Sequence, residues 1–288
     1  MKRGSWLLLT AALLWGGSYV AQTLAMDHLG PNAFVFCRYL LATVILIPFA
    51  ARSFRNKGDD RDLIRRSLLS GVLSGIPLGF GMIFQQLGLT GTTAGKAAFL
   101  TSLYMVFTPL LGLLVGKRVG IKVWAAIVLA LFGSYLLCVT EEFSIGKSDL
   151  IVLLAAVCIA VQLLILDRFR TGVDSMIQSF VTEGVVTLIA MAIMLMNRET
   201  PAFSSIASCI LPILYAGIFG GMLADTFQVI GQKEVEPTVC ALLMSLESVF
   251  GVLFGILFLH ESLSVKEMVG CVLILVGVIY SQLQSNKE

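Results

Sequence analysis

Five ionisable side chains lie within long apolar segments of the sequence or at their edges: Arg38, Lys96, Glu183, Asp225 and Glu247. Placing a charged side chain at the centre of a bilayer costs ~2.5–3.5 kcal/mol even on insertion scales, so such residues usually have a function. If the segments span a membrane, these five residues are candidates for binding a charged substrate, for carrying a coupling proton or for gating.

The two acids at the end of this set have different surroundings. Glu247 lies near the middle of the apolar segment 238–259. A carboxyl group removed from water takes up a proton more readily, so Glu247 is a candidate coupling group that binds either a proton or a cationic substrate. The alternative is a glutamate that joins helices by hydrogen bonds to Ser245 or Ser248. Asp225, near the end of its segment, is either a gate residue or a surface acid that reaches the interface.

Arg38 and Glu183 lie 145 positions apart. We expect Arg38 to line a cavity and to meet an anionic group, either a substrate carboxylate or a protein carboxylate. The alternative is a buried ion pair that joins Arg38 to Glu183 and locks their two helices. Lys96 opens an apolar segment, where it acts as a gating charge at the mouth or simply extends its side chain to the interface.

Aromatic and amide side chains within the apolar segments complete the candidate site: Trp15, Tyr19, Gln22, Gln85, Tyr104 and Gln228. Small-molecule sites combine apolar and aromatic walls with a few placed polar groups. Together with Arg38 these residues are predicted to line a substrate cavity. For each aromatic residue, plain helix packing or lipid contact is the alternative.

The composition decides which elements position these residues. Apolar residues make up 57% of the 288 residues and charged residues only 13%, about half of the roughly 25% found in soluble domains. A spanning helix needs ~20 mostly apolar residues. Ten such segments follow one another, near 5–25, 32–51, 67–88, 97–115, 121–140, 148–166, 176–196, 207–230, 238–259 and 265–284. The sequence therefore predicts an all-α membrane protein with ten transmembrane helices.

Loop charges predict the orientation of these helices. With the N-terminus inside, fifteen Lys and Arg residues fall on the inner side and four on the outer side. Both termini are therefore predicted to be cytoplasmic, in a multi-pass protein of the cytoplasmic membrane. The longest polar connection runs from Arg52 to Arg66. The first segment is too long for a signal-peptide core, so we count it as the first helix.

The two halves of the chain resemble each other. Phe84-Gln85 with Gly88 matches Phe227-Gln228 with Gly231, Ser102 matches Ser245, and Gly133 matches Gly277, at offsets of 143 to 144. Each half holds five predicted helices, so the second enters from the opposite side, as in secondary transporters with inverted repeats. We expect one five-helix repeat over 1–140 and another over 146–285. Glycines at four-residue spacing predict close helix packing at Gly71/Gly75/Gly79, Gly112/Gly116, Gly217/Gly221 and Gly251/Gly255.

Several motifs resemble those of the EamA-type permeases in the drug/metabolite transporter superfamily. They are Leu14-Trp15-Gly16-Gly17-Ser18, Pro31 with Arg38-Tyr39-Leu40-Leu41-Ala42, Pro237-Thr238 with Ser245-Leu246-Glu247-Ser248-Val249-Phe250, and Leu259-His260-Glu261-Ser262-Leu263 with Gly270 and Gly277. The resemblance implies a ten-helix permease that moves small metabolites, such as amino acids or drug-like compounds, often outward through a cavity between the halves. Two departures are Ser248, where proline is usual, and Lys117-Arg118, where a Gly-Glu pair is common.

Other functions find less support in the sequence. His260-Glu261 begins like a zinc motif but lacks the second histidine, and the six cysteines show no ligand spacing, so we expect neither metal nor cofactor nor enzymatic activity. A net charge of +2 indicates no nucleic-acid partner. The expected partners are a small-molecule substrate, membrane lipids and, as a candidate coupling ion, the proton. A lipid flippase on the same scaffold is the first alternative function and an intramembrane enzyme the second, and a homodimer is the alternative to a monomer.

Overall fold

The computed structural model describes residues 3–92, 94–139, 146–259 and 264–285, which contain helices and no strand. Ten helical segments are long and apolar enough to cross a membrane. The elements are α1 (Arg3–Met26), α2 (Pro31–Lys57), α3 (Arg61–Leu89), α4 (Ala94–Ser102), α5 (Tyr104–Leu114), α6 (Ile121–Cys138), α7 (Lys147–Arg168), α8 (Ser175–Met196), α9 (Phe203–Ser208), α10 (Ile210–Tyr215), the π-helix η1 (Ala216–Asp225), α11 (Thr226–Gly231), α12 (Pro237–Met244), α13 (Glu247–Leu259) and α14 (Val265–Ser285). The predicted all-α class with ten spans is confirmed. The His260-Glu261-Ser262-Leu263 part of the closing motif lies outside the described residues.

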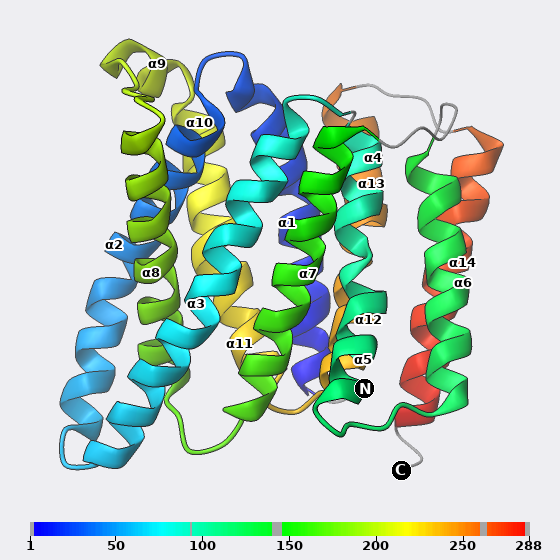
Figure 1. Cartoon of the computed structure of the whole chain (residues 1–288), viewed down its shortest axis with the longest axis horizontal. Coiled ribbons are helices and arrows are strands. Elements are labelled where there is room, and N and C mark those ends of the chain that lie inside the picture. The colour runs from blue at the N-terminus through cyan, green and yellow to red at the C-terminus, as the bar shows by residue number, and fades with distance from the viewer. Residues whose placement is uncertain (1–2, 93, 140–145, 260–263, 286–288) are drawn as a thin grey trace.

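The polar connection predicted between Arg52 and Arg66 is mostly helix. α2 continues to Lys57 and α3 begins at Arg61, so the two helices are joined by a short turn (Figure 1). Arginine and lysine are good helix formers and extend a helix beyond its apolar part. Asp60 begins α3, because its side chain accepts a hydrogen bond from the backbone N–H of Leu63 at 2.9 Å.

Two spans that the sequence predicts as single helices are interrupted. Leu103 separates α4 from α5, and Ser245 and Leu246 separate α12 from α13. At each break a serine hydroxyl donates to a carbonyl three residues earlier: Ser102 Oγ to Phe99 O at 2.7 Å, and Ser245 Oγ to Leu242 O at 2.8 Å. Such bonds compete with the helical ladder and bend helices. A third span contains the π-helix η1 between α10 and α11.

Glycines bring several helix pairs into close contact. A Cβ atom on Gly71 would lie 2.6 Å from Val181 Cβ of α8, and one on Gly133 would lie 2.8 Å from the Gly270 carbonyl of α14. The predicted close packing is therefore confirmed for the Gly71/Gly75/Gly79 series. It is wrong for Gly116, which has nothing within 4 Å and a φ of 81°. Gly116 follows α5 in a left-handed conformation that favours glycine at helix ends.

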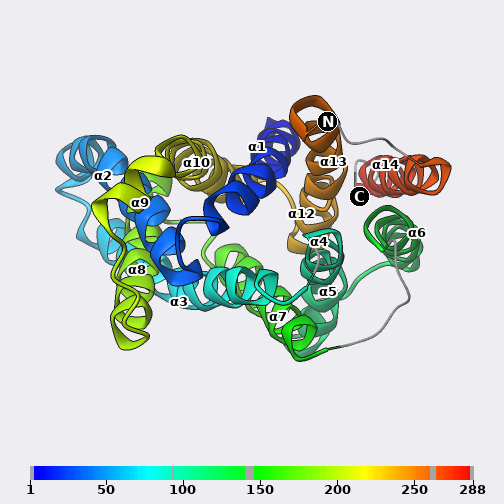
Figure 2. The same cartoon turned by 90° about the horizontal axis from the view of Figure 1, so that it is seen from above.

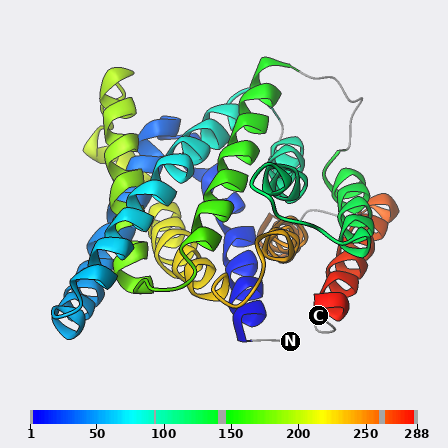
Figure 3. The same ribbon diagram turned by 60° about the horizontal axis from the view of Figure 1, so that its bottom comes forward.

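The helices form one bundle, and residues of α6 and α14 belong to its main buried core. Seen from above, α6 and α14 lie side by side at one edge, and α2 and α8 lie at the other (Figure 2). Helices α1, α3 and α7 and the interrupted pairs α4–α5 and α12–α13 surround the middle. The first turn of α1 and the last turn of α14 lie at the same end of the bundle (Figure 3), as an even number of spans requires.

Candidate functional site

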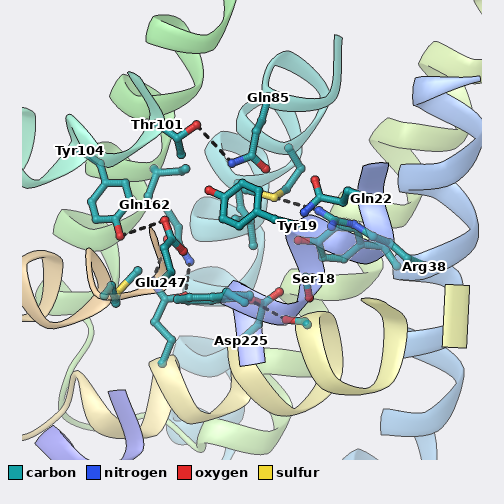
Figure 4. A pocket seen from close by; sticks show the side chains of 18 residues that line it. Ser18, Tyr19, Gln22, Arg38, Gln85, Thr101, Tyr104, Gln162, Asp225 and Glu247 are labelled. Carbon is teal, nitrogen blue, oxygen red and sulfur yellow. Dashed lines mark hydrogen bonds between the residues drawn. The ribbon is translucent and has the colours of Figure 1, made fainter. Parts of the chain in front are cut away.

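A cavity lies in the middle of the bundle, and helices from both halves of the chain line it (Figure 4). Its volume is about 50 Å³, which is room for roughly three to five water molecules. The lining residues are Trp15, Ser18, Tyr19, Gln22, Arg38, Tyr39, Leu78, Met82, Gln85, Thr101, Tyr104, Ile159, Gln162, Gly220, Asp225, Gln228, Met244 and Glu247. Aromatic rings and amides dominate this surface, with one cation and two acids among them.

Most of the residues singled out by the sequence meet at this cavity. All seven predicted cavity residues line it, namely Trp15, Tyr19, Gln22, Arg38, Gln85, Tyr104 and Gln228. Of the four predicted coupling or gating residues, Asp225 and Glu247 line it, whereas Glu183 and Lys96 do not. The functional roles of all eleven remain predictions.

Glu247 opens α13 and is only 7% exposed. The Tyr104 hydroxyl donates to its Oε1 at 3.3 Å, and the Tyr19 phenol is its second polar neighbour. Ser245 and Ser248 instead donate to the carbonyls of Leu242 and Ser245. The alternative in which these serines hold Glu247 is therefore wrong. Two phenols at one carboxyl group leave it able to bind either a proton or a cation from the cavity.

Asp225 ends η1 and is 4% exposed, so the interpretation as a surface acid is wrong. Trp15 Nε1 donates to Asp225 Oδ1 at 3.2 Å and to the Gly220 carbonyl at 2.9 Å. Glu183 of α8, 1% exposed, interacts with Asp225, although neither of its oxygens has a hydrogen-bond partner among the described residues. The two acids thus form a buried pair, with Asp225 facing the cavity.

Arg38 is 5% exposed and lines the cavity without a carboxylate partner. No carboxylate oxygen of the described residues lies within 4.0 Å of its guanidinium. Its Nη2 contacts Met82 Sδ at 3.1 Å, its Cζ lies 4.7 Å from the centre of the Tyr39 ring, and its Nε has no partner. The locking ion pair with Glu183 is therefore wrong. Of the two groups expected to meet Arg38, the protein carboxylate is absent from its contacts.

Lys96 lies away from the cavity and joins two helices. Its Nζ lies 2.6 Å from Asp149 Oδ2 of α7, and the same carboxyl accepts from Thr92 Oγ1 and from the Gly146 N–H, both at 2.6 Å. Lys96 thus ties the start of α4 to the start of α7. At the other end of α7, Asp167 forms an ion pair with Lys117. Neither acid could be recognised as a partner from the sequence, because both lie at the ends of an apolar segment, where charged residues are common.

Several lining residues were missed by sequence reasoning. Gln162 pairs with Gln228 in both directions, at 3.4 and 3.2 Å, and Gln85 donates to Thr101 at 3.3 Å. Gln162 could have been found, because it is an amide in the middle of an apolar segment. Met82 could not, since methionine is common in apolar segments and its contact with Arg38 exists only in three dimensions. In the described part of the chain no three His, Cys, Asp or Glu residues are grouped to hold a metal ion.

Comparison with known proteins agrees with this architecture. An uncharacterized transporter of Archaeoglobus fulgidus is 28% identical over 278 residues, covering 96% of this chain and 85% of the relative. One from Clostridium kluyveri is 28% identical over 313 residues, covering 100% of this chain and 95% of the relative. A crystal structure with 18% sequence identity superposes with a TM-score of 0.78 over 99% of this chain and 98% of the other, so the fold is shared.

The family comparison covers nearly all of the chain. The profile described as the EamA-like transporter family matches twice, over residues 2–139 and 146–282. Ten spans and two such matches make this a multi-pass membrane transporter. The chain belongs to the EamA-like transporter family.

Proposed function

We propose that this transporter is a permease that carries small metabolites by alternating access through the central cavity. The observation that carries the proposal is a buried polar cavity lined by both halves, with Arg38 and Glu247 on different sides of it (Figure 4). Such a site offers a small molecule aromatic walls, hydrogen-bonding amides and two groups of opposite charge type. Amino acids are one class of molecule that fits this chemistry.

The two halves are proposed to be inverted repeats over 1–140 and 146–285. Equivalent contacts support this: a Cβ on Gly88 would lie 3.1 Å from the Ser148 carbonyl, and one on Gly231 would lie 2.7 Å from the Gly4 carbonyl. Adding 143 to 88 gives 231, and subtracting 144 from 148 gives 4, so each contact becomes the other when the halves are exchanged. The double match of one family profile supports the same repeat.

Alternating access requires the bundle to change shape around the cavity. A volume of about 50 Å³ holds a few waters, so a metabolite enters only when the helices move apart. The interruptions at Leu103 and at Ser245–Leu246, together with η1, border the cavity and are the proposed hinges. Mid-helix departures from α geometry are typical of such places.

We assign proton coupling to Glu247. The polar groups of the described residues that face it are Tyr104 from α5 and Tyr19 from α1. No Lys or Arg of the described residues forms an ion pair with this carboxyl within 4.0 Å. From the distribution of loop charges we propose that the protein lies in the cytoplasmic membrane, with both helix ends, Arg3 and Ser285, on the inner side. The lipid flippase is kept as the alternative outcome of the test.

The test combines cells and vesicles. Metabolite profiling of cells with and without the protein identifies solutes whose distribution changes, and proteoliposomes then measure counterflow of each labelled solute. The control is Trp6→Phe, because Trp6 is 62% exposed and is not among the residues that line the cavity. We expect the unaltered protein to catalyse counterflow of a water-soluble solute and the Trp6→Phe control to retain this activity. Reorientation of labelled lipid without any solute exchange would establish the flippase instead.

A further inference from the structure

We infer that Arg38 is the binding site for a carboxylate on the transported molecule, and that Met82 occupies this site until the carboxylate arrives. The inference rests on the proposed function and adds to it the chemical class of the substrate. It makes Met82 a specificity-determining residue, because the thioether and the substrate compete for one guanidinium.

Arg38 lacks a strong hydrogen-bond acceptor among the described residues. A guanidinium has five N–H donors, but its polar contact is Met82 Sδ at 3.1 Å, and its Nε has no partner among the described residues. A thioether sulfur is only a weak acceptor. The residue is nevertheless 5% exposed and lines the cavity. A buried charge without a strong acceptor is costly, so the cavity is built to receive an acceptor from outside the chain.

Two aromatic rings support the guanidinium of Arg38. Its Cζ lies 4.7 Å from the centre of the Tyr39 ring and 5.8 Å from that of Phe34. These two rings come from the same helix, α2, so they support the guanidinium without satisfying its N–H groups. Aromatic contacts of this kind stabilise a cation through the ring face and leave the hydrogen-bonding edge available. An acceptor with two oxygens in a plane matches that edge.

A carboxylate suits the surroundings of Arg38 better than a phosphate does. Asp225 lines the same cavity as Arg38, and Glu183 lies beside Asp225, so a doubly charged anion at Arg38 would have two acids nearby. The cavity volume of about 50 Å³ also favours the smaller group. A carboxylate binds a guanidinium through two parallel hydrogen bonds. The remainder of the molecule then meets uncharged groups such as Gln22, Tyr19 and Trp15.

Met82 has a flexible side chain that can move away from the guanidinium of Arg38. It lies on α3 and is only partly buried, and methionine has three rotatable side-chain bonds that let it fill or vacate irregular space. Its sulfur gives up a weak contact when a carboxylate forms two charge-assisted hydrogen bonds. The exchange therefore favours a carboxylate over an uncharged acceptor, whose hydrogen bonds to the guanidinium are weaker.

Binding can be measured without transport. In a Trp6→Phe/Trp124→Phe background the remaining tryptophan of the three is Trp15, which lines the cavity. Its fluorescence is titrated with propionate, propionamide and propylammonium, which share one carbon chain and differ in their head group. We expect propionate to bind at least tenfold more tightly than propionamide, whereas propylammonium reports on the acids Asp225 and Glu247 that line the same cavity. Binding of propionamide as tight as that of propionate overturns the inference.

Three variants test the role of each residue. Arg38→Gln should weaken propionate binding at least tenfold. Met82→Leu, which keeps the volume and removes the sulfur, should strengthen it about two- to fivefold. Met82→Glu should abolish it while the protein stays folded, because the new carboxylate pairs with Arg38 from within the chain. Unchanged propionate binding in Met82→Glu overturns the inference, even where Arg38→Gln does not fold.

The binding result and the transport result are separable. Head-group preference in the fluorescence titration with no solute counterflow in vesicles would leave the carboxylate site standing and remove the permease. Counterflow of an uncharged solute with no propionate response would leave the permease standing and remove the carboxylate site. The two measurements use the same purified full-length chain, so neither failure can be mistaken for the other.

Discussion

The two halves of the chain place similar backbone features around the cavity but give them different side chains. The break after Ser102 and the break at Ser245–Leu246 lie 143 positions apart. The helix that resumes begins with Tyr104 in the first half and with Glu247 in the second, and these two side chains are hydrogen-bonded to each other at 3.3 Å. The proposed repeat thus supplies the scaffold, and the difference between the halves supplies the titratable group.

A second pair shows the same division. Arg38 and Glu183 lie 145 positions apart and carry opposite charges, yet they form no ion pair within 4.0 Å. The cation faces the cavity, and the acid lies beside Asp225. The two positions therefore differ in their surroundings: Arg38 lines the cavity, and Glu183 lies beside Asp225 outside the cavity lining.

The largest expected effect on transport comes from removing the titratable group that distinguishes the start of α13 from the start of α5. Glu247→Gln keeps the shape of the side chain and removes its ionisable proton. If this group couples transport to protons, proton uptake driven by substrate should fall at least tenfold (~1.4 kcal/mol or more), and the pH dependence of transport should disappear. A pH-sensitive dye inside proteoliposomes, read together with labelled substrate, measures both quantities.

Tyr104→Phe is the matched control for that variant. It removes the hydrogen bond to Glu247 but leaves the carboxyl group in place, so coupling should persist with a loss of about 1 kcal/mol or less in binding or stability. Equal pH dependence in Glu247→Gln and in the unaltered protein would show that the acid is structural and that the coupling group lies elsewhere.

The next prediction compares how much two contacts at helix starts contribute to stability. Lys96 joins α4 to α7 through Asp149, with side-chain exposures of 17% and 5%. The second contact joins the connection between α11 and α12 to the start of α1. The exposed Glu234 of this connection accepts a hydrogen bond from the Gly4 N–H at 2.7 Å. Lys96→Met should lower stability by about 2–3 kcal/mol because it leaves a buried acid without its cation, whereas Glu234→Gln should cost less than about 1 kcal/mol.

Thermal unfolding of the two purified variants in one detergent measures this difference. A further variant, Lys96→Met/Asp149→Leu, removes both charges and should recover part of the loss, since replacing a whole buried pair is often close to neutral. Equal losses in Lys96→Met and Glu234→Gln would mean that the two ends are held equally firmly, contrary to the asymmetry seen in their contacts.

A smaller effect tests whether the halves are equivalent in packing. A Cβ on Gly133 of α6 would lie 2.8 Å from the Gly270 carbonyl, and one on Gly277 of α14 would lie 2.9 Å from the Ala126 carbonyl. Both alanine variants should therefore cost a similar ~1–3 kcal/mol through overpacking. Gly112→Ala is the control, because its nearest neighbour lies at 3.6 Å. A loss in only one of the two glycine variants would break the equivalence of α6 and α14.

These comparisons also show what a sequence can predict in such a protein. The ten spans follow from apolar length, and the glycine contacts of α3 follow from four-residue spacing, because both are local patterns. Nine of the eleven candidate residues line the cavity, since polar groups in lipid must face protein or water. The contact of Met82 with Arg38 and the ion pair of Lys96 with Asp149 could not be predicted, because they depend on how separate helices pack.

The smallest expected effect concerns the cause of the two helix breaks. Ser102 and Ser245 each donate to a carbonyl three residues earlier, and such side-chain bonds destabilise a helix slightly. Ser102→Ala and Ser245→Ala should each raise stability by about 0.5 kcal/mol, measured by thermal unfolding. They should also slow transport, because a straighter helix is a poorer hinge. If only Ser245→Ala slows transport, the break beside Glu247 is the one that moves with the coupling group, and the break beside Tyr104 serves as its fixed counterpart.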